Sequence, residues 1–539
     1  MPSVTDRLRA LPWWARGSLA AVAGAVASLG YAPQSWWPLL ILAVAALTLL
    51  TVPAPSNWHA VLAGTFFGLG LYLVGVRWLS VIFVEAMLGL AALEAAFLGL
   101  LGLLLRWAGR SRAWPVLTAG CWLLIEAVFS HFPFEGFPWL RLGYTTIDSP
   151  LAGLLPLVGV PGAGFAFALA AQLLAWTVLS AETVRGRLLG LAAVFAVLLS
   201  GLPGMLVPAG AEQGTVQVGY VQGNAPGGGI YGLGAPRTIT RNHLAETLRL
   251  AARIEAGELP EPDFVVWPEN GTDMDPFLDA ETAQMVAATV DAVGVPVLIG
   301  TITEGPGPNE RQTAAIVWYP DTGPKARYDK RNLVPFGEWV PLRGLLEPIF
   351  PVVRYVGAQS VPGVGPGVLD VDLADGRTIK VGDLICYEVA YDSTVHETVT
   401  GGGQLNVVQS SNAMYVGTGQ VAQQFAITRA RAAELRRDIL VVTTTGTSGL
   451  IRPDGSVAFT LPPFQPASGV VQLPLRSGLT PAATFSGWVE ALAVLATITA
   501  LAWTLWRHRG GTADTQQAPR RRRGTVRQNG VAEANQETP

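Results

Sequence analysis

Long apolar runs constrain this chain more than any other feature of its sequence. A helix needs about 20 mostly apolar residues to cross the hydrocarbon core of a bilayer. The chain holds eight such runs, near residues 17–33, 36–53, 58–80, 86–106, 114–130, 152–180, 187–207 and 485–506. They predict an α-helical transmembrane bundle of about eight spans, with seven of them in residues 1–209.

The composition agrees with a membrane protein, because half of the 539 residues are hydrophobic and only 14% are charged. A typical soluble domain carries about 25% charged residues. Residues 210–482 differ, since their apolar runs are shorter and Asp, Glu, Asn, Gly and Pro return. We therefore expect a globular domain there, large enough to bury its own core, followed by a transmembrane helix at 483–507. The net charge of −3 gives no reason to expect a nucleic-acid partner.

The first apolar run also has features of a secretory signal peptide. Arg7, Arg9 and Arg16 precede it, and Ala-Val-Ala at 25–27 is an A-x-A sequence of the kind found at cleavage sites. A second apolar run follows almost at once and six more come later. This arrangement favours a retained first helix that belongs to the bundle.

The arginines near the spans predict the orientation of the bundle, because cytoplasmic loops carry an excess of Lys and Arg. With a cytoplasmic N-terminus, the short segments on the outer side hold only Arg77 and Arg141. The cytoplasmic side then holds Arg106, Arg110, Arg112, Arg185, Arg187, Arg507, Arg509 and Arg520 to Arg523. This scheme places residues 210–482 on the outer face of the membrane. Residues 508–539 are basic and lack an apolar period, so we expect a disordered cytoplasmic tail.

Short β-branched runs alternate with helical patterns throughout the predicted globular domain. The expected strands are 215–223, 263–269, 295–303, 314–320, 378–388, 405–412 and 438–445. The expected helices are 241–256, 280–293 and 419–435. Strands that alternate with helices favour an α/β domain with a covered sheet, in which chemistry collects where strands end.

Three of these strand ends carry unusual residues. Glu269 follows the strand in VVWPEN, Lys330 and Glu338 lie in YDKRNLVPFGE, and Cys386 ends the strand in LICYE. A thiol needs a base or a positive neighbour to become a useful nucleophile. A carboxylate can accept the thiol proton, and an ammonium can stabilise an oxyanion. Glu269, Lys330 and Cys386 therefore form a workable nucleophilic site if the fold brings them together.

The motifs WPE, YDKxxLVPFGE and ICYE, in this order, resemble the nitrilase or carbon–nitrogen hydrolase superfamily, whose catalytic set is Glu-Lys-Cys. With eight spans around that domain, the chain from about 10 to 506 resembles the apolipoprotein N-acyltransferase family. Further matches are GLGLYLVGVRWLSV (68–81), GFPWLRLGY (136–144), VQGNAP (221–226) and QSSNAMYVGT (409–418).

The resemblance implies an external nitrilase-like α-β-β-α sandwich on a multi-pass protein of the bacterial cytoplasmic membrane. The implied reaction moves an acyl chain from a membrane phospholipid to the N-terminal amine of the S-diacylglyceryl-cysteine of an apolipoprotein, through a cysteine thioester. Carried over by motif, Glu269 is the general base, Lys330 the oxyanion stabiliser and Cys386 the nucleophile. No metal or cofactor is implied, neither an HExxH nor a P-loop motif occurs, and a monomer is expected.

Three further residues receive supporting roles from the same motifs. Glu338 is expected to be a second carboxylate beside the site. The backbone N–H of Tyr387 is expected to be a second oxyanion donor. Glu388, which follows directly, is expected to support the site rather than to act as its base.

The chain departs from the family pattern in two places. The segment 225–237 is Gly-rich where the family has an aromatic residue soon after VQGN, and Tyr231 is the candidate for that role. Residues 413–415, Ala-Met-Tyr, replace an acidic-aromatic sequence. Contacts of the loops that cover the site, and hence the preference for an acyl donor, are therefore less well predicted than Glu269, Lys330 and Cys386.

Two other functions stay open at the level of the sequence. A membrane-tethered amidase or nitrilase would use water as the acceptor and would share the same three residues. A non-catalytic scaffold for another cell-envelope enzyme is the second alternative, and an intact Glu-Lys-Cys set argues against it. The eight predicted spans and the segments GFPWL and WLSV favour a lipid acceptor.

Several other chemistry-bearing residues have simpler interpretations. Cys121 lies inside the fifth span and is expected to be inert packing that forms no disulfide with the nucleophile. Glu94 and Glu126 fall inside spans, where ionisable groups suggest function. Glu126 is expected only to orient the FPWL loop, and neither is placed in the site. A Cys–His site with His243 or His396 is disfavoured, because each is expected to be a surface or capping residue.

Overall fold

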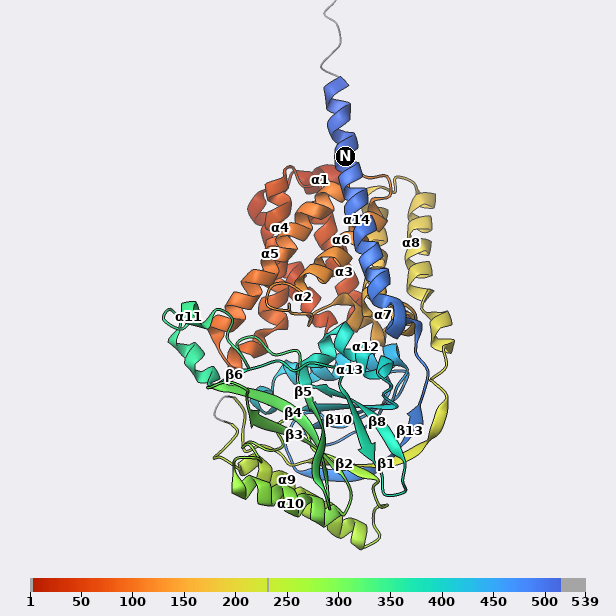
Figure 1. Cartoon of the computed structure of the whole chain (residues 1–539). Coiled ribbons are helices and arrows are strands. Elements are labelled where there is room, and N and C mark those ends of the chain that lie inside the picture. Colours follow the sequence, from red (N-terminus) through yellow and green to blue (C-terminus); the bar gives the residue numbers. More distant parts are fainter. Residues whose placement is uncertain (1–2, 230–231, 515–539) are drawn as a thin grey trace, which may run out of the picture.

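The structure is a computed structural model that describes residues 3–229 and 232–514. Figure 1 shows a helical bundle above an α/β domain, with the long helix α14 (Pro481–Asp514) running up beside the bundle. Positions 230 and 231 are the part of the segment 225–237 that is not described, so the prediction made for Tyr231 lies outside the described residues.

Helices occupy all eight of the apolar runs. After the short α1 (Val4–Arg9), the bundle consists of α2 (Trp13–Ala27), α3 (Trp37–Thr51), α4 (Asn57–Gly75), α5 (Val84–Ala108), α6 (Trp114–Phe129), α7 (Leu155–Leu179), α8 (Val184–Leu199) and α14. Within residues 3–229 and 232–514, five helical segments are long and apolar enough to cross a membrane: 57–75, 84–108, 150–179, 184–206 and 481–508. Helices α3 and α6 are apolar but shorter.

The end of α14 differs from the prediction. The helix continues to Asp514, so residues 508–514 are helical rather than disordered. No proline interrupts the chain between the predicted end at residue 507 and Pro519, and a helix stops most readily where a proline or a capping residue ends it. The remainder of the predicted tail, 515–539, lies outside the described residues.

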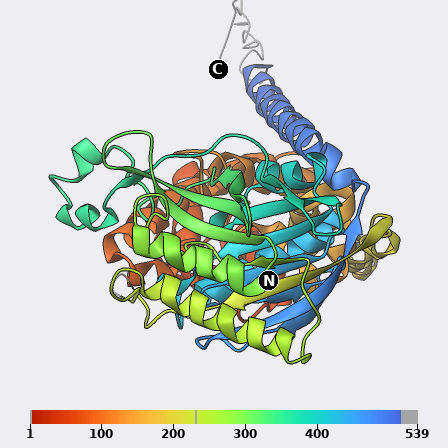
Figure 2. The same ribbon diagram turned by 60° about the horizontal axis from the view of Figure 1, so that its bottom comes forward.

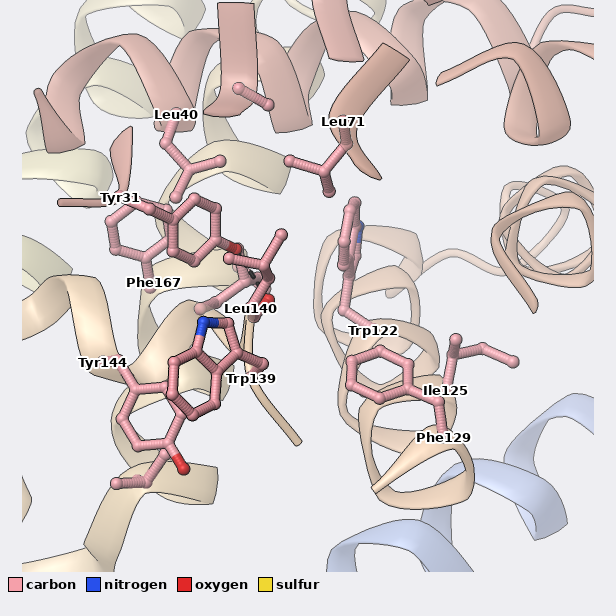
Figure 3. Packing of buried hydrophobic residues seen from close by; sticks show 14 of the residues in the cluster. Tyr31, Leu40, Leu71, Trp122, Ile125, Phe129, Trp139, Leu140, Tyr144 and Phe167 are labelled. Carbon is pink, nitrogen blue, oxygen red and sulfur yellow. Dashed lines mark hydrogen bonds between the residues drawn. The ribbon is translucent and has the colours of Figure 1, made fainter. Parts of the chain in front are cut away.

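Small residues let the helices of the bundle approach closely. A Cβ atom at Gly24 would lie 1.9 Å from the carbonyl oxygen of Phe67, and one at Gly64 would lie 2.0 Å from that of Leu98. Glycine at such positions is typical of membrane helices that associate through backbone packing. Aromatic side chains fill the space between the helices further in (Figure 3), where the hydroxyl of Tyr31 donates to the carbonyl oxygen of Leu140 at 2.8 Å.

The α/β domain contains two sheets. The first has the order β13-β1-β2-β3-β4-β5, with β6 paired to β4, and the second has the order β12-β11-β10-β9-β8-β7. The strands of the first sheet are β1 (Glu212–Gln222), β2 (Phe264–Val266), β3 (Val297–Glu304), β4 (Glu310–Tyr319), β5 (Gly323–Asp329), β6 (Gln359–Ser360) and β13 (Ala467–Arg476). Those of the second are β7 (Val368–Asp372), β8 (Thr378–Ile385), β9 (Leu405–Ser410), β10 (Ile439–Thr443), β11 (Gly449–Ile451) and β12 (Val457–Thr460).

Helices cover the outer face of each sheet. Apolar side chains of the two sheets pack against each other in one buried cluster. Helices α9 (Thr238–Glu255) and α10 (Ala280–Val293) lie side by side over the first sheet, on the side away from the bundle (Figure 2). Helices α12 (Asp392–Thr400) and α13 (Gly419–Leu435) cover the second sheet and lie between it and the bundle (Figure 1). The second sheet is therefore the one nearer to the membrane helices.

A glutamine of α13 joins the domain to the bundle. The Oε1 atom of Gln423 accepts hydrogen bonds from the indole N–H groups of Trp78, at 2.9 Å, and Trp139, at 2.8 Å. Its Nε2 atom donates to the carbonyl oxygen of Gly75 at 2.9 Å. Both polar atoms of the amide side chain and both indole N–H groups are thus buried with partners, which fixes the position of the two tryptophans.

Buried ion pairs add a second connection. Arg431 of α13, which is 0% exposed, donates to Asp392 and to Glu434, each at 2.6 Å. Asp392 also accepts from Arg141, in the loop that follows α6, at 2.8 Å. Because a buried charge is costly without a partner, this network specifies one orientation of the domain against the bundle.

Candidate active site

Cys386 lies at a sharp turn directly after β8. It is the first residue of a short 3-10 helix, η7 (Cys386–Ala390), and its φ angle is +55°. A residue with a side chain pays a conformational cost in this left-handed region, and such strain is typically found at functional sites. The turn ends the strand abruptly, so the sulfur is presented at the edge of the second sheet rather than inside it.

The structure brings Glu269, Lys330 and Glu338 into direct contact. The Nζ atom of Lys330 donates to Glu269 Oε1 and to Glu338 Oε1, each at 2.8 Å. The second oxygen of Glu269 accepts from the N–H of Ser411 at 2.8 Å, and that of Glu338 accepts from the N–H of Val334 at 2.7 Å. Lys330 is 1% exposed. Each of the three side chains is therefore held in place by more than one hydrogen bond.

The protonation states of the site follow from burial and from these charges. Burial disfavours the ammonium of Lys330, but Glu269 and Glu338 outweigh this effect and hold its pKa well above its ordinary value. Burial and the charge of Glu269 raise the pKa of the Cys386 thiol to about 12, although Lys330 acts in the opposite direction. The resting site at neutral pH thus contains a charged lysine and a protonated thiol. A base must remove the thiol proton as the sulfur attacks.

Glu388 connects the turn at Cys386 to the segment that carries Lys330. Its Oε2 atom accepts from the N–H of Ile385 at 2.7 Å. Its Oε1 atom accepts from the hydroxyl of Tyr328 at 2.7 Å and from the N–H of Arg331 at 2.6 Å. Burial raises the pKa of Glu388, while the hydrogen bonds that it accepts oppose that rise. These contacts fit a positioning residue, because they tie the residue before the nucleophile to the segment that follows Lys330.

Replacing Glu388 by glutamine is expected to lower the stability by about 1–3 kcal/mol, because the new amide NH₂ faces a backbone N–H or a phenol that had an acceptor. We expect kcat to fall more than KM, since the turn carrying the nucleophile shifts while the substrate cavity stays intact. Thermal unfolding and steady-state kinetics measure the two effects.

The matched control for this change is Glu397→Gln. Glu397 pairs with Arg331 on the same segment but is 40% exposed in its side chain, so its loss should cost only about 0–1 kcal/mol. A Glu388→Gln protein with wild-type stability and wild-type kcat would contradict a positioning role.

The side chain of Tyr387 lies against the bundle rather than beside Glu269 and Lys330. Its ring stacks on Trp139 at 5.7 Å and on Phe137 at 6.1 Å between centroids, and it meets Tyr391 edge-on at 5.2 Å. Its backbone N–H lies in the first turn of η7, where helical N–H groups have no intrahelical partner. The backbone of Tyr387 is thus available to an oxyanion, while its ring forms part of a wall.

That wall belongs to a cavity of about 650 Å³ between the α/β domain and the bundle. Cys386, Tyr387 and Tyr415 line it from the domain. From the bundle, the lining residues come from the start of α5 and from the loop 132–139, and an arm of the domain within 334–353 closes a further side. Nearly all of these side chains are apolar or aromatic. Pockets of this kind bind apolar ligands, with a few polar groups that fix the orientation.

Sequence reasoning did not assign several residues that build the site. Ser411, Tyr415, Phe137 and Trp139 all lie in the local matches QSSNAMYVGT and GFPWLRLGY, which were noted without a role for single residues. The positions of these motifs relative to the nucleophile depend on long-range packing. Gln423 lies outside every motif, and no sequence pattern pointed to it.

The remaining candidates lie away from the nucleophile. His243 is 0% exposed and packs on Trp267 with ring centroids 5.2 Å apart, so the expectation of a surface or capping residue is wrong. Its helix packs on the first sheet, and a histidine on the inner face is buried with the apolar residues. His396 contacts Glu434 at 3.1 Å. Glu126 accepts from the N–H of Leu142 at 2.8 Å and so orients the loop after FPWL as expected.

Both cysteines are free, and Cys121 is fully buried inside the bundle. Among the residues that the structure describes, no group of three or more His, Cys, Asp and Glu side chains is arranged to hold a metal ion.

Comparison with protein families supports each half of this architecture. Residues 23–173 match the apolipoprotein N-acyltransferase N-terminal domain, and residues 233–477 match the carbon–nitrogen hydrolase domain. The fold and the site therefore define an enzyme of the carbon–nitrogen hydrolase class whose catalytic domain is joined to a membrane bundle. An amidase of the nitrilase superfamily from Nesterenkonia AN1 aligns with 52% of this chain and 95% of its own, with 16% identity and a TM-score of 0.36.

Full-length relatives narrow the class to one family. An apolipoprotein N-acyltransferase of Mycolicibacterium smegmatis is 34% identical over 508 residues, which cover 89% of this chain and 84% of that protein. One of Azotobacter vinelandii is 31% identical over 532 residues, which cover 93% of this chain and 97% of that protein. The chain belongs to the apolipoprotein N-acyltransferase family. It is accordingly a membrane acyltransferase with a nitrilase-type catalytic domain.

Proposed function

We propose that this protein transfers a fatty acyl chain from a membrane phospholipid to the N-terminal amine of the S-diacylglyceryl-cysteine of apolipoproteins. One observation carries the proposal: Cys386, on whose thiol the charge of the buried Lys330 acts, lines an apolar cavity of about 650 Å³ that extends along α5 into the bundle. A nucleophile in the wall of such a cavity can attack the ester of a lipid whose acyl chain lies among the helices.

In the first half-reaction, Cys386 Sγ attacks the ester carbonyl carbon of the phospholipid while Glu269 accepts the thiol proton. Lys330 and the N–H of Tyr387 stabilise the oxyanion of the tetrahedral intermediate. When the intermediate collapses, the ester C–O bond breaks and the lysophospholipid oxygen takes the proton from Glu269. The acyl chain is then held as a thioester on Cys386, inside the cavity.

In the second half-reaction, the free amine of the apolipoprotein attacks the thioester carbonyl carbon, and Glu269 accepts a proton from the nitrogen. Lys330 and the Tyr387 N–H stabilise the oxyanion again. The C–S bond breaks, the proton returns from Glu269 to the departing sulfur, and the product is an amide. One base and one pair of oxyanion donors serve both steps, so donor and acceptor use the same site in turn.

Glu338 has an indirect role in this scheme. Its contact with Lys330 adds a second negative charge beside the ammonium, which helps to keep Lys330 protonated. It also fixes the Nζ atom between two carboxylates. Glu388 holds the turn at Cys386 against the segment that follows Lys330.

We further propose the arrangement in the membrane. All eight helices that lie in the apolar runs, α2 to α8 and α14, would cross the bilayer. Residues 1–209 would form the N-terminal bundle, and residues 483–507 would lie within the last span. Residues 210–482 would form an α-β-β-α sandwich on the outer face of the bacterial cytoplasmic membrane. The arginine distribution supports this side, because the short segments there hold only Arg77 and Arg141. Both lipid substrates would then reach the site from the membrane plane.

The experiment uses the purified full chain in mixed micelles with phospholipid and a synthetic diacylated lipopeptide. Mass spectrometry should show one added acyl chain on the lipopeptide amine and an equal amount of lysophospholipid. A blocked lipopeptide with an acetylated amine is the matched control and should gain no mass. Release of free fatty acid without N-acylation would support the hydrolase alternative, and consumption of neither substrate would refute both.

A further inference from the structure

The acyl cavity contains one ionisable side chain deep in the bundle. Helix α5 lines the cavity with residues from Glu85, at its first turn, to Glu94. Glu94 lies nine residues further along the helix, which is roughly 13 Å at 1.5 Å per residue. Helix α5 starts next to the α/β domain and runs away from it (Figure 1). Glu94 is therefore the α5 residue of the cavity that lies farthest from the catalytic domain.

The surroundings of Glu94 leave part of its carboxyl group without a partner. The side chain is 1% exposed, and its Oε2 atom has no hydrogen-bond partner among the described residues. Tyr72 of α4 lies beside it as a neighbouring hydrogen-bonding group. The α5 residues that precede it in the cavity, Leu90 and Leu93, are apolar. A buried ionisable group inside a membrane helix is costly and marks a functional position.

Tyr387 lines the same cavity as this carboxyl group and lies next to the nucleophile in the chain. It follows Cys386 in the chain and stacks on the bundle loop that contains Phe137 and Trp139. Burial and Tyr391 raise the pKa of Tyr387 well above its ordinary value, and Glu94 adds to this effect. Cys386, Tyr387 and Glu94 all line the same cavity, so the nucleophile and this carboxyl group belong to one continuous lining.

Acyl chains that fill the cavity meet this carboxyl group differently according to their length. A chain that ends before Glu94 leaves its oxygen free to keep a water molecule. A longer chain brings methylene groups against the oxygen, displaces that water and leaves a buried polar atom without any partner, which is unfavourable. The α5 residues that line the cavity between Glu85 and Glu94 are apolar, so along this helix the difference depends on chain length.

We propose that Glu94 is a specificity-determining residue, which limits the length of the acyl chain that the cavity accepts. The inference rests on the proposed function, since it takes the cavity to be the acyl site of the transfer reaction. It adds a selection among donors: phospholipids whose acyl chain stops short of Glu94 are preferred over those whose chain extends past it.

The test compares wild type with Glu94→Leu in a competition between phospholipids that differ only in acyl length, from 12 to about 20 carbons. Both donors are present in one reaction with the lipopeptide acceptor, and mass spectrometry gives the ratio of the two products. This ratio does not depend on the fraction of active protein. We expect Glu94→Leu to raise the relative use of the longer chain by roughly tenfold, which corresponds to relief of one unpartnered polar atom.

Two further variants separate polarity from size and position. Glu94→Gln keeps a polar side chain of the same shape and should retain the wild-type preference. Glu85→Leu makes the same chemical change at the exposed start of α5, at the other end of the cavity lining, and should also leave the ratio unchanged. An unchanged ratio in Glu94→Leu, with transfer still occurring, would overturn the inference.

A binding measurement keeps the inference separate from the proposed function. Native mass spectrometry of the full chain with the same phospholipids reports which acyl lengths stay bound without any reaction. A shift of the bound lipids toward longer chains in Glu94→Leu supports the length limit even if wild type transfers nothing, in which case only the proposed function fails. Identical bound lipids in the two proteins would overturn the length limit whatever the transfer result.

Discussion

Cys386→Ala is expected to reduce acyl transfer by at least about 10⁴-fold, because removal of a covalent nucleophile abolishes the acyl-enzyme pathway. The substitution does not remove the ion pairs of the site, since Lys330 keeps its contacts with Glu269 and Glu338. The melting temperature should therefore stay close to that of wild type. N-acylation of the lipopeptide, followed by mass spectrometry, measures the loss.

Wild type incubated with phospholipid alone should also gain the mass of one acyl chain on the peptide that contains Cys386. Cys121→Ala is the matched control, because this cysteine is fully buried in the bundle and is not among the residues that line the cavity. It should retain both transfer and the acyl adduct. Transfer by Cys386→Ala at more than one hundredth of the wild-type rate would rule out the thioester mechanism.

Lys330→Met should cost both activity and stability. The substitution leaves Glu269 and Glu338 facing each other without the ammonium that lies 2.8 Å from each. Removing one partner of a buried ion pair typically destabilises a protein by about 3–5 kcal/mol. Loss of the oxyanion contact should lower kcat by a further factor of about 10²–10³. Thermal unfolding and transfer assays measure the two effects.

The pH dependence of stability distinguishes this explanation from a simple packing defect. In the variant, two carboxylates face each other without a cation between them, so acid, which neutralises one of them, should relieve their repulsion and increase the stability. In wild type, the pKa of Lys330 is raised above its ordinary value. That contribution is complete below the ordinary lysine pKa of about 10.4 and is lost only as the pH rises through the folded value. The contribution of Lys330 to the stability of wild type should therefore stay constant between pH 6 and about 9.

The matched control is Lys325→Met, because Lys325 lies in β5, the strand that ends directly before Lys330. Lys325 is about half exposed, and its nearest carboxylate, on Asp372, lies 3.7 Å away. Its loss should change stability by about 0–1 kcal/mol and leave activity unchanged. A Lys330→Met protein as stable as Lys325→Met at pH 7 would contradict the structural role of the buried lysine.

The sequence allowed the parts of the site with strong local patterns to be predicted. Glu269 and Cys386 each follow an apolar strand, Lys330 lies in the motif YDKRNLVPFGE, and the structure places Glu269 and Lys330 in contact. The φ angle of +55° at Cys386 was not predictable, because nothing in LICYE distinguishes a sharp turn from a continuing strand. The role of Glu388 was only outlined, since its donors at Tyr328 and Arg331 come from a segment more than fifty residues earlier.

The fold shows the same division between local and distant information. Apolar runs indicated the eight helices α2 to α8 and α14, and β-branched runs indicated seven of the eight interior strands of the two sheets, all but β11. Strands such as β5 and β12 escaped prediction, because their residues are largely polar or exposed and gain their pairing from neighbours. Gln423 joins tryptophans 284 and 345 residues away, a contact that no periodicity can indicate.

The pairing of β1 with β13 has a consequence for how the protein is made. These strands lie next to each other, from Glu212 opposite Arg476 to Gln222 opposite Ala467, although one follows α8 and the other precedes α14. During synthesis, β1 must therefore wait for some 250 residues with one edge unpaired, an arrangement that invites association with other chains. Its partner emerges only just before α14 begins at Pro481. The pairing of β1 with β13 and the insertion of the last helix are thus nearly simultaneous. A chain whose synthesis stops before residue 467 leaves β1 without this partner strand.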